Sequence, residues 1–166
     1  SPRYEWNKET PFHPEYYYEE FSLPGRRMNT SRGWEIYPQI MYDMAMRLKS
    51  EYGNIPWFIA ESGMGIEQEE RFADSKGTIQ DDYRIAYITE HLNSLLDAVK
   101  DGANCNGYML WAFTDCVSPM NAFKNRYGLV RIDLEDDKKR SLKQSAYWYR
   151  DLIQSKRLEV AEHTYK

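Results

Sequence analysis

A carboxylate at the end of an apolar run, Glu61, is the side chain of this protein best placed to do chemistry. Residues 57–60 before it are apolar without strict alternation, which predicts a strand buried on both faces, as in a parallel sheet. Residues 62–65, Ser-Gly-Met-Gly, must turn. A charged residue between a buried strand and a loop is typical of the catalytic face of α/β barrels. The alternative is that Glu61 only marks where the strand reaches solvent.

A second apolar run, residues 107–113, also ends in polar residues, Thr114 and Asp115. Since parallel strands end at one edge of a sheet, we expect Glu61 and the region from Trp111 to Asp115 to lie side by side, an arrangement suited to holding a sugar. A retaining glycosidase needs two carboxylates about 5–5.5 Å apart, a nucleophile and a proton donor. Asp115 is a weak candidate for the second, because an Asp at a strand end is more often used to hold a loop by hydrogen bonds.

The loop that follows, residues 118–128, combines a hydroxyl, two cations and a phenol: Ser118, Lys124, Arg126 and Tyr127. Such a set can bind a phosphate through charge-assisted hydrogen bonds. The alternative is a surface loop with ordinary solvated cations, and composition alone favours that alternative.

Composition excludes several classes of function. Of the 166 residues, 42% are hydrophobic and 29% charged, which indicates a globular domain, and the 15% aromatic content suits either a sugar site or a tyrosine-rich core. A net charge of −4 without a basic stripe argues against nucleic acid as a partner. No apolar run approaches the roughly 20 residues of a membrane span. Cys105 and Cys116 form no disulfide framework and indicate reduced, cytosolic thiols.

Metal and nucleotide chemistry are not indicated either. His13, His91 and His163 lack metal-ligand spacing, and no glycine-rich nucleotide motif occurs. We therefore expect neither a metal nor a cofactor. His91 is expected on the surface of its helix.

Helical and extended patterns alternate along the chain. Helices are predicted at residues 35–52, 81–101 and 141–156, and buried strands at residues 57–60 and 107–113. This order predicts an α/β fold with a parallel sheet.

The intervening segments are predicted to be less regular. Residues 67–77 are read as a solvated loop, 129–132 as a short extended piece and 133–140 as a charged turn region.

Two strands alone do not make a stable sheet, so the chain is expected either to be part of a larger fold or to self-associate. We interpret it as one partial domain over residues 1–166. Within it, residues 1–33 form an irregular loop segment, 34–156 a helix-strand-helix-strand-helix core, and 157–166 a tail.

Four sequence blocks, in order, resemble family 1 glycoside hydrolases. Residues 55–65 are similar to the nucleophile motif, usually Ile-Thr-Glu-Asn-Gly, with Ala60 and Ser62 in place of Thr and Asn. Gly-Trp-Glu-Ile-Tyr-Pro at residues 33–38 matches a family block. The other two blocks lie at residues 81–91 and 107–133.

The resemblance covers roughly residues 29–153, the C-terminal third or so of a family member. It implies part of a (β/α)8 TIM barrel, incomplete in this chain, and a retaining β-glycosidase that needs no cofactor or metal. It also implies Glu61 as the nucleophile and Trp111 beside the sugar. The family's acid/base lies in an Asn-Glu-Pro motif, which does not occur in this sequence. The isolated chain is therefore expected to be inactive.

The loop after Trp111 resembles that of members acting on 6-phospho-β-glycosides. Ser118 stands where ordinary β-glucosidases carry a Glu that would repel a phosphate. The resemblance implies that Ser118, Lys124 and Tyr127 hold the phosphate, with Lys124 one residue earlier than usual and Asn125 in its place. Pro119, where galacto-type members carry Trp, leans toward the gluco type. A phosphorylated β-glucoside or disaccharide and a cytoplasmic location follow as expectations. An ordinary β-glucosidase and a non-catalytic, sugar-phosphate-binding half-barrel remain the alternatives.

Overall fold

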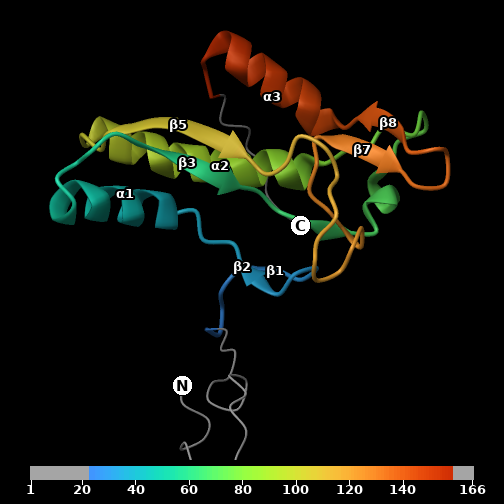
Figure 1. Ribbon diagram of the computed structural model, residues 1–166, viewed down its shortest axis with the longest axis horizontal. Coiled ribbons are helices and arrows are strands. Elements are labelled where there is room, and N and C mark those ends of the chain that lie inside the picture. Colours follow the sequence, from blue (N-terminus) through green and yellow to red (C-terminus); the bar gives the residue numbers. More distant parts are fainter. Residues whose placement is uncertain (1–22, 159–166) are drawn as a thin grey trace, which may run out of the picture.

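Two parallel strands, β3 (Trp57–Ser62) and β5 (Cys105–Leu110), form the centre of the fold in a computed structural model that describes residues 23–158 (Figure 1). Helix α2 (Asp82–Lys100) makes the crossover between them. Helix α1 (Ile40–Glu51) precedes β3, and α3 (Gln144–Ser155) follows the strands. The predicted alternation of helix and parallel strand is confirmed.

Helix α1 begins five residues later than expected. Strand β2 (Trp34–Glu35) occupies the predicted start of the helix and pairs antiparallel with β1 (Met28–Asn29). The predicted irregular segment, residues 1–33, therefore contains a short strand in its described part. Residues 1–22 of that segment, and 159–166 of the predicted tail, lie outside the described residues.

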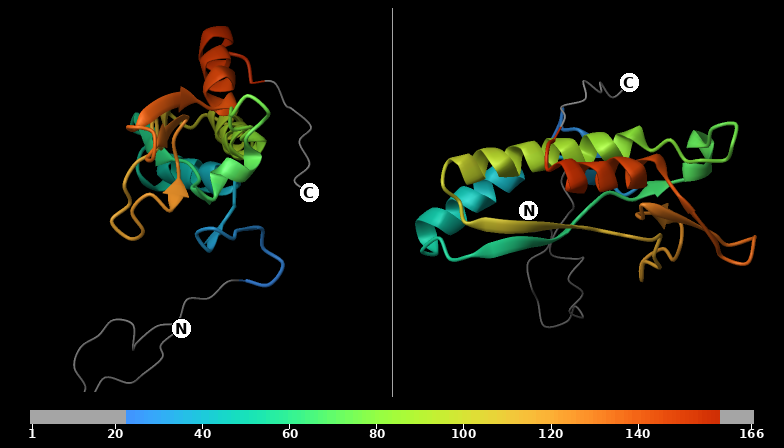
Figure 2. Two further views of the ribbon diagram at one scale, coloured as in Figure 1. Left: turned by 90° about the vertical axis from the view of Figure 1, so that its right-hand side faces the viewer. Right: turned by 90° about the horizontal axis from the view of Figure 1, so that it is seen from above.

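Helices α1 and α2 lie together on one face of the β3–β5 pair (Figure 2). Ala45 and Ala98 are fully buried there, and Trp57 packs against them. On the other face Phe58 and Met109 are 58% and 52% exposed. The prediction of a strand buried on both faces is therefore wrong for this chain, because residues 23–158 provide no second layer on that side.

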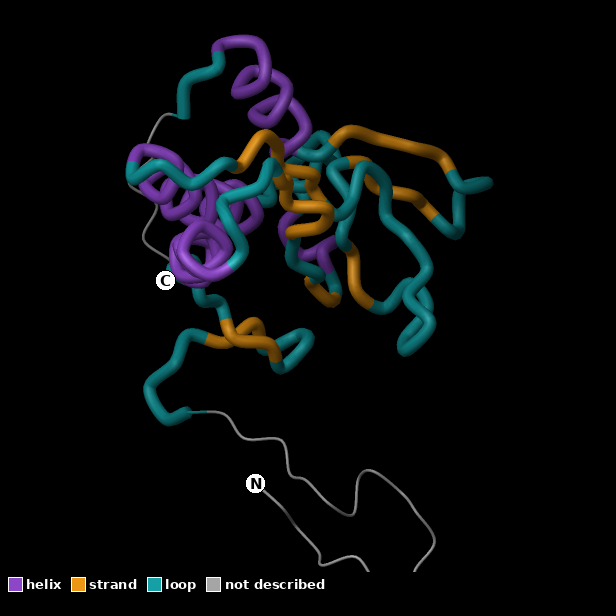
Figure 3. Tube along the Cα trace, turned by 60° about the vertical axis from the view of Figure 1, so that its left-hand side comes forward, coloured by secondary structure: helices purple, strands orange, loops and turns teal. Residues whose placement is uncertain are grey.

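Two short antiparallel strand pairs follow the two central strands. Strand β4 (Ile66–Glu67) pairs with β6 (Asn125–Arg126), and β7 (Val130–Asp133) forms a hairpin with β8 (Lys139–Leu142) that extends away from α1 and α2 (Figure 3). The short extended piece predicted at 129–132 is thus β7. Strand β8 was missed, because its charged sequence is typical of a turn.

Residues 67–77 are mostly exposed, as their charges predicted, but they are not loop throughout. They include the 3-10 helix η2 (Glu69–Phe72), in which Glu69 is only 1% exposed. A carboxylate can be buried to this extent only when cations and hydrogen-bond donors surround it.

Those cations are Arg84 of α2 and Lys143, which precedes α3. Arg84 Nη2 lies 2.6 Å from Glu69 Oε1, and its Nε lies 2.9 Å from Asp81 Oδ2. Lys143 Nζ pairs with Glu69 and lies 2.9 Å from Asp115 Oδ1. All five side chains are at most 2% exposed, so they form one buried ionic network. The network joins η2, α2, the loop after β5 and the start of α3.

The network also holds backbone segments. Arg84 Nη1 donates to the carbonyls of Met64 at 2.6 Å and Tyr127 at 2.9 Å. Asp81, which directly precedes α2, makes no side-chain capping bond to that helix and accepts from the backbone N–H of Ser145, 64 residues away, at 2.8 Å. Among the described residues, no helix is both long and apolar enough to cross a lipid bilayer.

Replacing Arg84 by methionine should lower the free energy of unfolding by about 3–5 kcal/mol, because Glu69 and Asp81 would lose a buried cation. Urea unfolding followed by circular dichroism measures the loss. The matched control is Arg47→Met, since Arg47 forms an exposed pair with Glu51 and its loss should cost within about 0.5 kcal/mol. Equal losses in the two variants would contradict the structural role of the network.

Candidate active site

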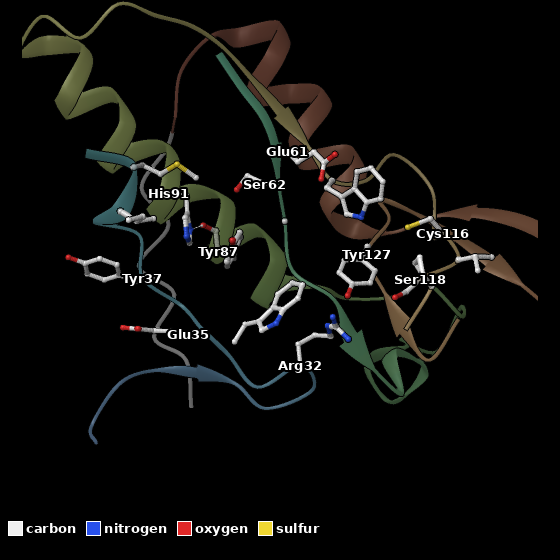
Figure 4. Close-up of a pocket in the computed structure, with 17 residues that line it drawn as sticks. Arg32, Glu35, Tyr37, Glu61, Ser62, Tyr87, His91, Cys116, Ser118 and Tyr127 are labelled. Atoms are coloured by element: carbon white, nitrogen blue, oxygen red, sulfur yellow. Dashed lines mark hydrogen bonds between the residues drawn. The ribbon is translucent and has the colours of Figure 1, made fainter. Parts of the chain in front are cut away.

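A cavity of about 610 Å³ lies at the C-terminal ends of β3 and β5 (Figure 4). Four of the five site residues predicted from the sequence line it, namely Glu61, Trp111, Ser118 and Tyr127. Lys124 does not. The structure therefore brings the expected nucleophile together with most of the expected substrate-binding groups.

Glu61 projects from the end of β3 and is exposed. Among residues 23–158 its carboxylate forms neither an ion pair nor a hydrogen bond, so both oxygens are available to a substrate. Trp111 lies beside it, because the Trp111 N–H donates to the Ser62 carbonyl at 2.8 Å. A Cβ on Gly63 would lie 1.8 Å from the Trp111 carbonyl oxygen, so only glycine permits this close approach. The Trp111–Ala112 peptide bond is cis.

Tyr127 packs against the loop after β3. A Cβ on Gly65 would lie 2.5 Å from its ring, so the ring occupies the space that any larger residue would take. Burial raises the pKa of the Tyr127 phenol, and the nearby Arg32 guanidinium partly opposes that rise. The phenol is therefore a protonated hydrogen-bond donor at neutral pH.

Asp115 holds a loop and does not line the cavity. Its side chain is 2% exposed and accepts from the N–H groups of Gly128 at 2.9 Å and Ile132 at 3.3 Å, as well as from Lys143. Of the two roles considered for Asp115, the loop-holding one agrees with this geometry.

The cations of the loop after β5 point elsewhere. Lys124 Nζ is 3.1 Å from Glu67 Oε1, and the Lys124 side chain is 65% exposed. The Arg126 side chain is 12% exposed and lies near Asp115 and Glu70. Ser118 remains at the cavity, where its Oγ accepts from the N–H of Met120 at 3.3 Å. The expected phosphate set is thus only partly assembled.

Sequence reasoning missed the contribution of residues 32–37 to the cavity. Arg32, Trp34, Glu35 and Tyr37 all line it. Most of them belong to the block that resembles the family, but that block was used only for recognition. Its density of aromatic and charged side chains in six residues was the available signal.

Helix α2 contributes two further lining residues, Tyr87 and His91. His91 is 3% exposed, so its predicted surface position is wrong. Its Nδ1 lies 2.7 Å from the Tyr87 carbonyl, and its ring stacks on that of Tyr87 at 3.9 Å. Burial lowers the pKa of His91, which keeps the imidazole neutral, with Nδ1 donating to the carbonyl.

Glu35 is the other carboxylate that lines the cavity. It pairs with Arg26 at 3.2 Å, and Figure 4 shows its carboxylate directed away from Glu61. Within the described residues, therefore, no second carboxylate is arranged to work with Glu61. No group of three or more His, Cys, Asp or Glu side chains suited to a metal occurs in this part of the chain either.

The fold and the site agree with comparisons to known proteins. Residues 8–158 match Glycosyl hydrolase family 1, and the chain belongs to this family. Its fold is similar to that of the β-glucosidase from Thermotoga maritima, with a TM-score of 0.76 and 27% identity over 89% of this chain and 32% of that one. The predicted incomplete (β/α)8 barrel is thereby confirmed.

Two curated relatives are more similar in sequence. The chain is 49% identical over 158 residues to 6-phospho-beta-glucosidase GmuD of Bacillus subtilis, covering 95% of this chain and 32% of that protein. It is 43% identical over 131 residues to a 6-phospho-beta-galactosidase of Staphylococcus aureus, covering 78% and 27%. The chain thus spans about a third of the length of the curated relatives it matches.

Replacing Gly65 by alanine should displace the Tyr127 ring, because the added methyl would lie 2.5 Å from it. We expect a loss of about 1–3 kcal/mol in the free energy of unfolding and a changed tyrosine fluorescence. Gly107→Ala is the matched control, since its Cβ would meet no atom closer than 3.4 Å. Similar behaviour of the two variants would contradict the packing described for Tyr127.

The stability of the chain should depend on the titration of His91 at pH values below about 6.5. Because burial lowers its pKa in the folded state, the unfolded chain binds the proton more readily. The contribution is complete above about pH 6.5 and is lost as the pH falls toward the folded-state pKa. Urea unfolding at several pH values measures it. In His91→Gln this part of the dependence of the unfolding free energy on pH should disappear. An unchanged pH dependence would contradict its assignment to His91.

Proposed function

We propose that this chain carries the nucleophile side of the active site of a retaining 6-phospho-β-glucosidase. The observation that carries the proposal is one cavity lined by Glu61, a carboxylate without a partner among residues 23–158, and by the hydroxyls of Ser118 and Tyr127. The 49% identity to a 6-phospho-beta-glucosidase supports the same substrate class.

In this proposal Glu61 attacks the anomeric carbon of the sugar and forms a covalent glycosyl–enzyme. A carboxylic acid outside this sequence protonates the oxygen of the leaving group as the glycosidic bond breaks. That same group, now a carboxylate, removes a proton from water, which attacks the anomeric carbon, frees Glu61 and releases glucose 6-phosphate. Trp111, 42% exposed beside Glu61, borders the sugar.

The phosphate preference depends on position 118. A glutamate there would add an anion facing the substrate's phosphate, whereas the Ser118 hydroxyl can donate a hydrogen bond to it. Tyr127, protonated at neutral pH, is a second donor. Lys124 is proposed to reach the phosphate only by leaving its exposed ion pair with Glu67. Uptake of phosphorylated sugars would place the enzyme in the cytoplasm.

The test completes the barrel by joining this chain to the N-terminal two-thirds of the Bacillus subtilis relative. Hydrolysis of p-nitrophenyl 6-phospho-β-glucoside should exceed that of the unphosphorylated glycoside by about 100-fold or more in kcat/KM, as expected for two charge-assisted hydrogen bonds. Glu61→Gln should lower kcat by on the order of 10⁴-fold. The isolated chain should show no turnover, and normal turnover by it would contradict the proposed need for an external acid.

Ser118→Glu in the completed barrel should abolish the preference for the phosphorylated substrate. The control is Ser75→Glu, which adds the same charge at an exposed turn position away from the cavity. A Ser118→Glu enzyme that kept its phosphate preference would favour another basis for specificity. A wild-type enzyme that preferred the unphosphorylated glycoside would indicate an ordinary β-glucosidase.

A further inference from the structure

The β1–β2 hairpin is fastened to the loop that follows the Glu61 strand. Asn29, 5% exposed, donates from Nδ2 to the Gly65 carbonyl at 2.9 Å, and the Glu67 N–H donates to Ser31 Oγ at 3.1 Å. The hairpin turn is closed by the N–H groups of Arg32 and Gly33, which donate to the Asn29 carbonyl at 3.1 and 2.8 Å. The backbone of Arg32 is therefore held in place relative to the cavity.

The side chain of Arg32 is directed into the cavity. Its guanidinium lies over the Trp34 ring, 4.4 Å from the ring centroid. Its Nε is buried and has no hydrogen-bond partner, and no carboxylate lies within ion-pair distance of Arg32, among residues 23–158. The neighbouring arginines differ, because Arg26 pairs with Glu35 and Arg27 with Glu90.

Three polar groups converge at this corner of the cavity. Figure 4 shows the Arg32 guanidinium next to the Tyr127 hydroxyl, with the Ser118 hydroxyl directed toward the same space. Of the described residues that line the cavity, Arg32 is the one lysine or arginine. Two carboxylates, Glu35 and Glu61, line it as well, so without Arg32 the cavity would repel an anion.

We infer that Arg32 is a specificity-determining residue that holds the phosphate of the substrate together with Ser118 and Tyr127. The inference rests on the proposed function and deepens it. A phosphate monoester carries about −1.5 to −2 charges at pH 7, and a guanidinium can bind two of its oxygens at once. Arg32 supplies the cation that Lys124, paired with Glu67 outside the cavity, does not supply.

The test measures binding to the chain itself by NMR titration with glucose 6-phosphate and with glucose. Wild-type protein should bind the phosphorylated sugar more tightly. Arg32→Gln should raise the Kd of glucose 6-phosphate by about 10- to 100-fold, the loss expected for a charge-assisted hydrogen bond, and leave glucose binding unchanged. Arg32→Lys, which keeps the charge but not the planar fork, should recover part of the affinity.

A control variant separates Arg32 from a general charge effect. Arg47→Gln removes one positive charge outside the cavity and should change the Kd less than about threefold, since exposed charges are screened. Lys124→Gln tests the other cation proposed to reach the phosphate. Circular dichroism and the urea midpoint of Arg32→Gln should match wild type, because the substitution leaves the backbone bonds of the hairpin in place.

The outcomes distinguish the two proposals. An Arg32→Gln protein that binds glucose 6-phosphate as tightly as wild type overturns the role of Arg32 alone. A large loss in Lys124→Gln with no loss in Arg32→Gln assigns the phosphate to Lys124. A wild-type chain that binds glucose 6-phosphate no more tightly than glucose contradicts the phosphate specificity, and the role of Arg32 with it.

Discussion

The site depends on one physical constraint, which is that charged side chains can be buried only together with partners of opposite charge. Arg84 and Lys143 are enclosed with three carboxylates, and each ion is tolerated away from water only because its partners are there. The same Arg84 guanidinium donates to the carbonyls of Met64 and Tyr127, one on the loop after β3 and one on the loop after β5. The two loops that form the cavity are therefore fixed to each other through α2.

Polar side chains whose hydrogen-bonding atoms all have protein partners hold the structure together, whereas those with unused atoms beside the cavity are available for chemistry. Asp115 uses both oxygens on backbone N–H groups and Lys143, so it has little left to offer a substrate. Glu61 and the Arg32 Nε, by contrast, have no partner among the described residues although both groups belong to the cavity. Charged groups left unpaired beside a cavity are the ones that a charged, hydroxyl-rich ligand can use.

The β3–β5 pair has an exposed face for the same reason that the site is incomplete, because the described residues form only part of a barrel. Phe58 and Met109 are exposed because a barrel interior is filled by residues from all its strands, and the described residues supply two. An apolar groove of about 730 Å³ lies between β5 and α3, and the exposed Met109 is among the residues that line it. In the proposed function the cavity at the rim is one side of an active site, and the chain spans about a third of the length of its curated relatives.

By itself the sequence determined the alternation of helices and parallel strands and the position of Glu61 at a strand end, because periodicity and turn residues act over a few neighbours. It also indicated that Trp111, Ser118 and Tyr127 belong near Glu61. Only the tertiary structure decided which charges are buried and which face the cavity. Glu69 and His91 are buried, and Arg32 rather than Lys124 lines the cavity, because contacts between segments as far apart as Asp81 and Ser145 control solvent access, and no local pattern records them.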